Sequence, residues 1–134
     1  MKFQSKGEEM MWNYISRYLK GNPKWRIEVH YYLPHAGFPY RAFADFALFY
    51  ENQLSIIIEV NGEEHYAPTF GEEQFQHIKK RDNDEYSWCQ KNNIWLLVYD
   101  WIKGYMLYGG NYWDVSDDFE DSVADVENFG LRKH

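Results

Sequence analysis

The stretch FADFALFYENQLSIIIEV, residues 43–60, decides the fold of this chain. Apolar and β-branched residues fill two short runs, and the polar residues ENQ at 51–53 separate them, so the stretch predicts a β-hairpin. Successive residues point to opposite faces of a strand, so Asp45 and Glu59 each interrupt an apolar face. A carboxylate in a buried strand is costly to desolvate unless a cation or a proton compensates it. If the two faces coincide, the acids lie together and predict a site for a hard divalent ion, Mg²⁺ or Mn²⁺.

Helical and extended segments flank this hairpin on both sides. Before it, Ser5 and Glu8 have the spacing of a capping box at the start of a helix that ends near Gly21, and residues 25–33 are typical of a strand. After it, the periodicity predicts a helix over residues 71–92, and residues 92–101 predict a further strand. This order predicts an α/β (α+β) fold with an αβββαβ core, in which helices flank a mixed central sheet.

The end of the chain differs in charge from the rest. The length of 134 residues predicts one domain, with a core over 1–103 and an acidic extension over 104–134 that carries most of the net charge of −7. Phe119, Val123, Val126 and Phe129 recur at helical spacing and predict a C-terminal helix docked by this apolar stripe. The alternative is a partly ordered, solubilising tail, and either form offers a surface to a protein partner. We expect the aromatic stretch 99–113 to form core and loop.

Composition narrows the class of protein. No apolar run is long enough to span a bilayer, and the first residues lack the apolar block of a secretory signal, so we expect a cytoplasmic protein without membrane association. The single cysteine, Cys89, has no internal disulfide partner and is expected to be a packed thiol. The negative net charge argues against strong nonspecific binding of polyanions. A nucleic-acid surface would therefore be local, and Lys79, Lys80 and Arg81 are its candidates.

Four segments, taken in order, resemble the PD-(D/E)XK nuclease superfamily. They are Ser5-x-Gly7-Glu8, ADF with Asp45, IIEVNGEEH with Glu59, and RDNDEYSWCQKNNIWLLVY over residues 81–99. Within the superfamily, the chain looks most like the small phage and bacterial nucleases around the very-short-patch-repair-type endonucleases. The resemblance implies a restriction-endonuclease-like fold and a metal-dependent endonuclease that hydrolyses phosphodiester bonds in DNA.

The resemblance also implies roles for individual residues. Asp45 and Glu59 would bind Mg²⁺ or Mn²⁺, the backbone carbonyl of Val60 would add a third ligand, and Glu8 would approach from the first helix. Apart from the resemblance, the unperturbed pKa of His65 lies near neutrality and suits a base or proton shuttle, and Lys79 or Lys80 could instead reach the site from the second helix.

The chain departs from the superfamily pattern at several positions. Asn61 stands where the superfamily usually has its catalytic lysine, and an amide can only orient water by hydrogen bonds. Glu64 replaces a glutamine, and Glu85 stands where a lysine often follows Asp82. We expect Glu64 and Asp82 to contact the residues that bind the ion without binding the ion themselves.

These departures keep other interpretations open. One alternative is a catalytically inactive domain that keeps the nuclease fold and binds DNA or a protein partner. At the level of single residues, Asp45 and Glu59 could instead pair with Arg41 or Lys79, or face water. A cut through both DNA strands usually requires two active sites, which a homodimer would supply.

Overall fold

The computed structural model describes residues 3–33, 37–62, 67–100, 105–108, 111–115 and 118–130, and only the backbone for 105–108, 111–115 and 118. The elements follow the predicted order as far as residue 100 and confirm the αβββαβ core of an α+β fold. They are α1 (Lys6–Tyr18), β1 (Trp25–Tyr32), β2 (Phe43–Tyr50), β3 (Gln53–Asn61), α2 (Glu72–Lys91), β4 (Trp95–Asp100), β5 (Tyr105–Tyr108), β6 (Asn111–Val115) and α3 (Asp118–Phe129).

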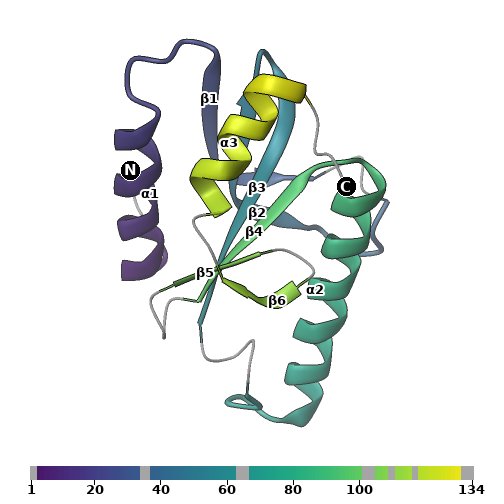
Figure 1. The fold of residues 1–134 in the computed structure, drawn as a ribbon. Coiled ribbons are helices and arrows are strands. Elements are labelled where there is room, and N and C mark those ends of the chain that lie inside the picture. The colour runs from purple at the N-terminus through teal and green to yellow at the C-terminus, as the bar shows by residue number, and fades with distance from the viewer. Residues whose placement is uncertain are drawn as a thin grey trace.

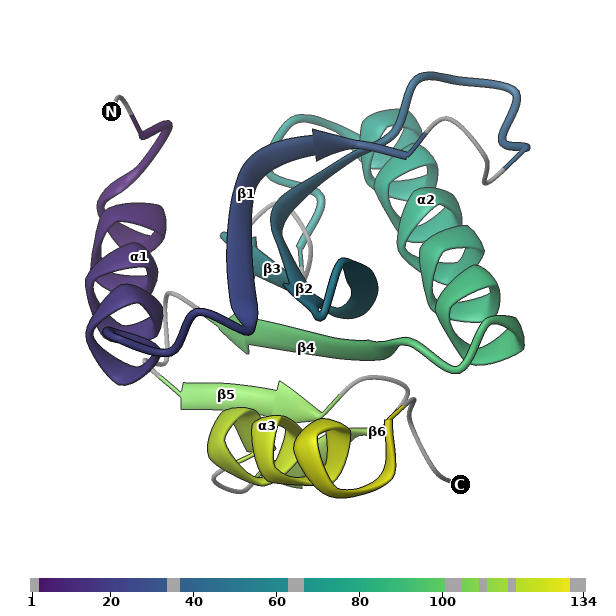
Figure 2. The same ribbon diagram turned by 90° about the horizontal axis from the view of Figure 1, so that it is seen from above.

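The described strands form one mixed sheet in chain order, from β1 to β6. Only β3 and β4 run parallel among these neighbours, and α2 makes the long crossover that a parallel pair requires. Figures 1 and 2 show α1 and α2 on opposite sides of the sheet, with α3 beside β5. No helix in the described part of the chain is long and apolar enough to cross a membrane.

Strands β5 and β6 correct one expectation. Part of the aromatic stretch 99–113 was expected to form loop, but the backbone is extended over 105–108, which pairs with β4, and over 111–115, which pairs with β5. Tyrosine and tryptophan favour strands because their broad side chains pack well on a pleated surface. The composition of this stretch was therefore a strand signal as much as a packing signal.

The turn between β2 and β3 fixes the register on which the site depends. Glu51 and Asn52 have φ values of 50° and 66°, as a type I′ hairpin turn requires at both central positions. Beyond a register shift after Leu48, the strands pair antiparallel as far as Phe46 with Ile58. The next positions along this register are Asp45 and Glu59, so the two predicted faces coincide.

Apolar side chains fill both faces of the sheet. Ile56 and Ile58 of β3 pack in one cluster with Met11 and Ile15 of α1, while Ile57 packs in a second cluster with Cys89 of α2. Strands buried on both faces have continuous apolar sequences, which explains the run of three isoleucines. Cys89 is a buried thiol that forms no disulfide, as predicted.

Helix α3 lies within the acidic segment and confirms the predicted C-terminal helix. Phe119, Val123 and Val126 of its stripe are buried in the cluster that also contains the α1 residues. Phe129, the fourth residue of the predicted stripe and the last residue of α3, is 58% exposed. The fully buried part of the stripe therefore ends at Val126.

Val126→Ala is expected to destabilise the protein by about 2 kcal/mol, because it leaves a cavity under a side chain that is 1% exposed. Phe129→Ala should change the free energy of unfolding by less than about 0.5 kcal/mol. Chemical denaturation of both variants measures the difference. Equal losses would show that α3 does not dock through this stripe.

Candidate metal centre

Two carboxylates bridge β2 and β3 where the hairpin ends. The backbone N–H of Asp45 donates to Glu59 Oε1 at 2.9 Å, and the backbone N–H of Val60 donates to Asp45 Oδ2 at 2.8 Å. Each acid therefore binds a main-chain donor of the opposite strand. Neither makes an ion pair with a described basic residue, so pairing with Arg41 or Lys79 does not account for them.

A third carboxylate reaches this pair from α2. The side chain of Glu85 lies within hydrogen-bonding distance of Glu59, one turn of helix after Asp82. Two carboxyl groups at such a distance share a proton or a cation, because two adjacent negative charges repel each other. Asp45, Glu59 and Glu85 thus form a cluster of three acids, here called the carboxylate cluster.

Protonation compensates the carboxylate cluster in the ion-free protein. Burial, followed by the charge of Glu59, raises the pKa of Asp45 to about 8. Burial, followed by the charge of Glu85, raises the pKa of Glu59 well above its usual range. Burial, together with the charges of Asp82 and Asp45, raises the pKa of Glu85 to about 7, although its hydrogen bond with Glu59 acts in the opposite direction. Near neutral pH the cluster therefore holds protons that a cation could displace.

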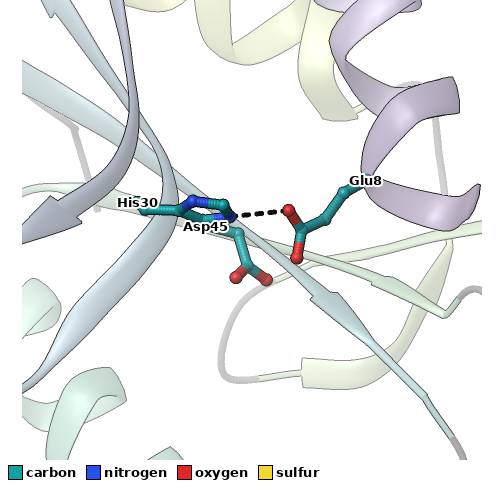
Figure 3. A group of neighbouring side chains, drawn as sticks. All are labelled: Glu8, His30 and Asp45. Carbon is teal, nitrogen blue, oxygen red and sulfur yellow. Dashed lines mark hydrogen bonds and ion pairs between the residues drawn. The ribbon is translucent and has the colours of Figure 1, made fainter. Parts of the chain in front are cut away.

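A second group of candidate metal ligands, Glu8 and His30, lies close to Asp45. Glu8 Oε1 lies 2.7 Å from His30 Nε2, and one ligand atom from each of Glu8, His30 and Asp45 lies within 4.8 Å of the other two. Figure 3 shows the carboxylates of Glu8 and Asp45 pointing into the same space beside the imidazole. Glu8 is only 4% exposed, so this buried acid faces the site.

Glu8 could be buried only because it caps α1 in a capping box, and the hydrogen bonds at the start of α1 bear on this alternative. Ser5 Oγ accepts the Glu8 N–H at 3.2 Å, so Ser5 caps α1 as predicted. In a full capping box, the Glu8 carboxylate would return to the Ser5 N–H. Instead it accepts a long 3.5 Å bond from the N–H of Gln4 and turns to His30. Capping alone does not explain Glu8.

His30 reaches the site through an unusual backbone conformation. Its φ is 52°, although it lies inside β1, where the neighbouring pairs Val29–Phe46 and Tyr31–Ala44 place it level with Asp45. A left-handed residue other than glycine costs on the order of 1 kcal/mol or more, and such strain is concentrated at functional sites. The kink turns the imidazole toward Glu8.

The carboxylate cluster opens into a pocket of about 310 Å³. Asp45, Glu59 and Asn61 contribute from the sheet, and α2 contributes Arg81, Asp82 and Glu85. The opposite wall is the segment that leads into β2, with Phe38, Tyr40, Arg41, Ala42 and Phe43. The site therefore combines an acidic sheet surface with aromatic and cationic walls.

The structure brings some of the predicted site residues together and leaves others outside its described part. Asp45, Glu59, Asn61 and Asp82 line one pocket, and Glu8 adjoins it through Asp45. Asn61 is 4% exposed and brings an amide to this pocket. For Val60 the structure assigns the N–H bond to Asp45, and its carbonyl as a ligand stays a prediction. Glu64 and His65 lie outside the described residues.

The three residues of the predicted basic surface, Lys79, Lys80 and Arg81, lie in different environments. Arg81 lines the pocket, whereas Lys80 Nζ makes an ion pair with Asp84 Oδ2 at 3.1 Å. Lys79 Nζ lies 5.4 Å from the centroid of the Phe75 ring. DNA contact by these three residues stays a prediction, and Arg81 has the position that suits it best.

Sequence reasoning missed His30 and Glu85 as members of the candidate site. Glu85 was visible as an acid three residues after Asp82 on the same helical face, but it was interpreted only as a departure from the family pattern. His30 gave no comparable signal, because its left-handed conformation is not readable from the surrounding strand sequence.

Comparison of the chain with protein-family models, with curated proteins and with solved structures gave no match.

Replacing His30 with asparagine is expected to weaken Ni²⁺ binding about tenfold and to leave Mg²⁺ binding nearly unchanged. Imidazole nitrogen suits Ni²⁺, whereas Mg²⁺ prefers carboxylate oxygen, and asparagine tolerates the left-handed backbone. Titration calorimetry measures both affinities, with His77→Asn on the exposed face of α2 as the matched control. Equal Ni²⁺ affinities of wild type and His30→Asn would remove His30 from the ligand set.

Proposed function

We propose that this protein is a Mg²⁺- or Mn²⁺-dependent endonuclease that hydrolyses phosphodiester bonds in DNA. The observation that carries the proposal is the meeting of Asp45 and Glu59 with Glu85 in a pocket whose walls bear two arginines. The resemblance of the ordered segments to PD-(D/E)XK nucleases supports the same function.

The donors present fit a hard divalent ion. Three carboxylates supply the oxygen ligands that Mg²⁺ and Mn²⁺ prefer. Burial, followed by the charges of neighbouring acids, raises the pKa values of these acids, and none of them makes an ion pair with a described basic residue. Asp45 and Glu59 would hold the ion, and the chemistry that it supplies is polarisation of the phosphate and a lowered pKa of a bound water.

The remaining pocket residues position the reactants. Arg41 and Arg81 carry guanidinium groups that suit phosphate oxygens. The amide of Asn61 can orient a water molecule by hydrogen bonds, but it cannot provide the positive charge of a lysine. His30, held by Glu8, has a ring nitrogen within 4.8 Å of an Asp45 carboxylate oxygen and is a candidate proton carrier.

The second candidate function is a domain of the same fold that binds an ion and DNA, or a protein partner, without cutting. The observation that favours it is Asn61, because this buried amide occupies the pocket at the position where the resemblance predicts a lysine. Glu85 adds an acid where a second lysine was expected. Function depends on the site and not on the fold, so only an assay separates the two.

The experiment is a cleavage assay on supercoiled plasmid, linear duplex, single-stranded DNA and RNA, with Mg²⁺, Mn²⁺ or EDTA. Wild type and Glu73→Ala, which changes an exposed acid of α2 outside the pocket, should cut in the presence of either ion. Asp45→Ala should lose about a thousandfold in rate. A wild type that gains thermal stability with the ion but cuts nothing supports the second candidate. One that does neither contradicts the metal centre itself.

A further inference from the structure

One wall of the pocket is an ordered stack of aromatic rings. The rings of Phe38 and Tyr40 are stacked, with centroids 5.4 Å apart and an interplanar angle of 17°. The Tyr40 hydroxyl donates to Asp84 Oδ2 at 2.7 Å, which ties this wall to α2. The wall is therefore fixed before any ligand arrives, and fixed aromatic surfaces bind bases at low entropic cost.

The guanidinium groups of the two pocket arginines lie next to aromatic rings. The Arg81 guanidinium lies 4.9 Å from the centroid of the Tyr40 ring, and that of Arg41 lies 5.2 Å from Tyr32 and 5.5 Å from Phe43. Among the residues that the structure describes, neither arginine makes an ion pair, although the pocket contains four acids. Both remain available to phosphate or to the face of a base.

The mouth of the pocket exposes a further aromatic ring. Phe43 is 49% exposed and lies two residues before Asp45 on the same face of β2. A phosphate at the carboxylate cluster would therefore have its neighbouring base within reach of Phe43 and the Phe38–Tyr40 wall. The volume of about 310 Å³ falls at the lower limit of small-ligand sites, which suits one nucleotide and not a stacked base pair.

We propose that this pocket takes one unstacked nucleotide next to the scissile phosphate. The substrates would then be single strands, or duplexes that contain an unpaired or extrudable base, and matched duplex would be a poor substrate. The proposal rests on the proposed nuclease function and narrows its substrate class.

The test measures binding and cleavage separately on three DNAs of one sequence: a single strand, the matched duplex and the duplex with one unpaired base. Fluorescence anisotropy in Ca²⁺, which also fills oxygen sites, measures binding, and gel assays in Mg²⁺ measure cleavage. Wild type should bind the single strand and the unpaired-base duplex about tenfold more tightly than the matched duplex.

Variants locate the preference in the pocket. Phe43→Ala and Phe43→Leu should each lose about tenfold in single-strand affinity, since both remove the ring and the leucine keeps apolar bulk. Phe70→Ala, which changes an aromatic residue that is 73% exposed and outside the pocket, should bind like wild type. Arg41→Gln should weaken binding and reduce its salt dependence, whereas Arg17→Gln on α1 should not.

Two results would overturn the inference. One is equal affinity for matched duplex and single strand, and the other is Phe43→Ala binding like Phe70→Ala. Cleavage of matched duplex that is unaffected by Phe43→Ala would leave the nuclease proposal standing and remove this inference. Phe43-dependent binding of single strands without any cleavage would remove the nuclease proposal and support the pocket as a nucleotide site.

Discussion

Glu59→Gln is expected to abolish metal-dependent cleavage and, at the same time, to raise the melting temperature of the ion-free protein. Glutamine keeps an oxygen that can accept the Asp45 N–H bond, so the hairpin retains its support. It removes one ionisable acid from the carboxylate cluster, where burial and then the charges of neighbouring acids raise the pKa values of Asp45 and Glu59. We expect a loss of about a thousandfold in cleavage rate and a gain of about 4 °C at pH 8.

Thermal melts in EDTA and in Mg²⁺, together with the cleavage assay, measure both effects. Wild type should gain stability on adding Mg²⁺, and Glu59→Gln should gain much less, because the ion has lost a charged ligand. Glu73→Gln, in an exposed turn of α2, is the matched control for loss of one acid. If Glu59→Gln melted below wild type in EDTA, the carboxylate would be a structural group and not a strained ligand.

The ion-free protein is expected to lose stability as the pH rises from 5 to 8. Burial and like charges raise the folded-state pKa of Asp45 to about 8 and of Glu85 to about 7, against ordinary values near 4 in the unfolded chain. In this window the unfolded chain binds fewer protons than the folded chain, so the free energy of unfolding falls with pH. The stabilisation is fully present below about pH 4 and is lost as the pH passes through the folded-state values.

Melting curves at pH 5, 6, 7 and 8 in EDTA should show a fall of about 5 °C or more. Saturating Mg²⁺ should reduce or reverse this fall, because the ion binds the ionised carboxylates and its affinity grows as protons leave. Glu59→Gln should flatten the profile in EDTA. A melting temperature that stays constant or rises from pH 5 to pH 8 without ion would contradict the protonated cluster.

The hairpin and the pair of acids on it could be predicted from the sequence because they depend on local patterns. Three local patterns predict the hairpin: the turn residues at 51–53, the alternation in residues 43–50 and the continuous apolar run before Glu59. Once the register was fixed, the pairing of Asp45 with Glu59 followed from strand geometry alone. The order of elements as far as β4 followed from the same periodicities.

The rest of the site depends on tertiary contacts that no local pattern carries. Glu85 lies next to Glu59 only because of the position that α2 takes against the sheet in the folded protein. His30 reaches Glu8 through a left-handed kink in β1, which the strand-like neighbours of His30 conceal. The wall formed by Phe38 and Tyr40 comes from a segment outside regular secondary structure, and its position is set by the bond from Tyr40 to Asp84.

The bonds from Asp45 and Val60 to the carboxylates give the site a further property. These two amide protons bind to the same acids that would hold the ion, so the ion state of the pocket and the opening of the β2–β3 ladder are one coupled equilibrium. Local opening at this end of the hairpin must break both amide–carboxylate bonds, and it would also separate the carboxylates that would hold an ion. Hydrogen exchange at the Asp45 and Val60 amides would therefore slow as the site fills, and would report its occupancy even in a protein that cuts nothing.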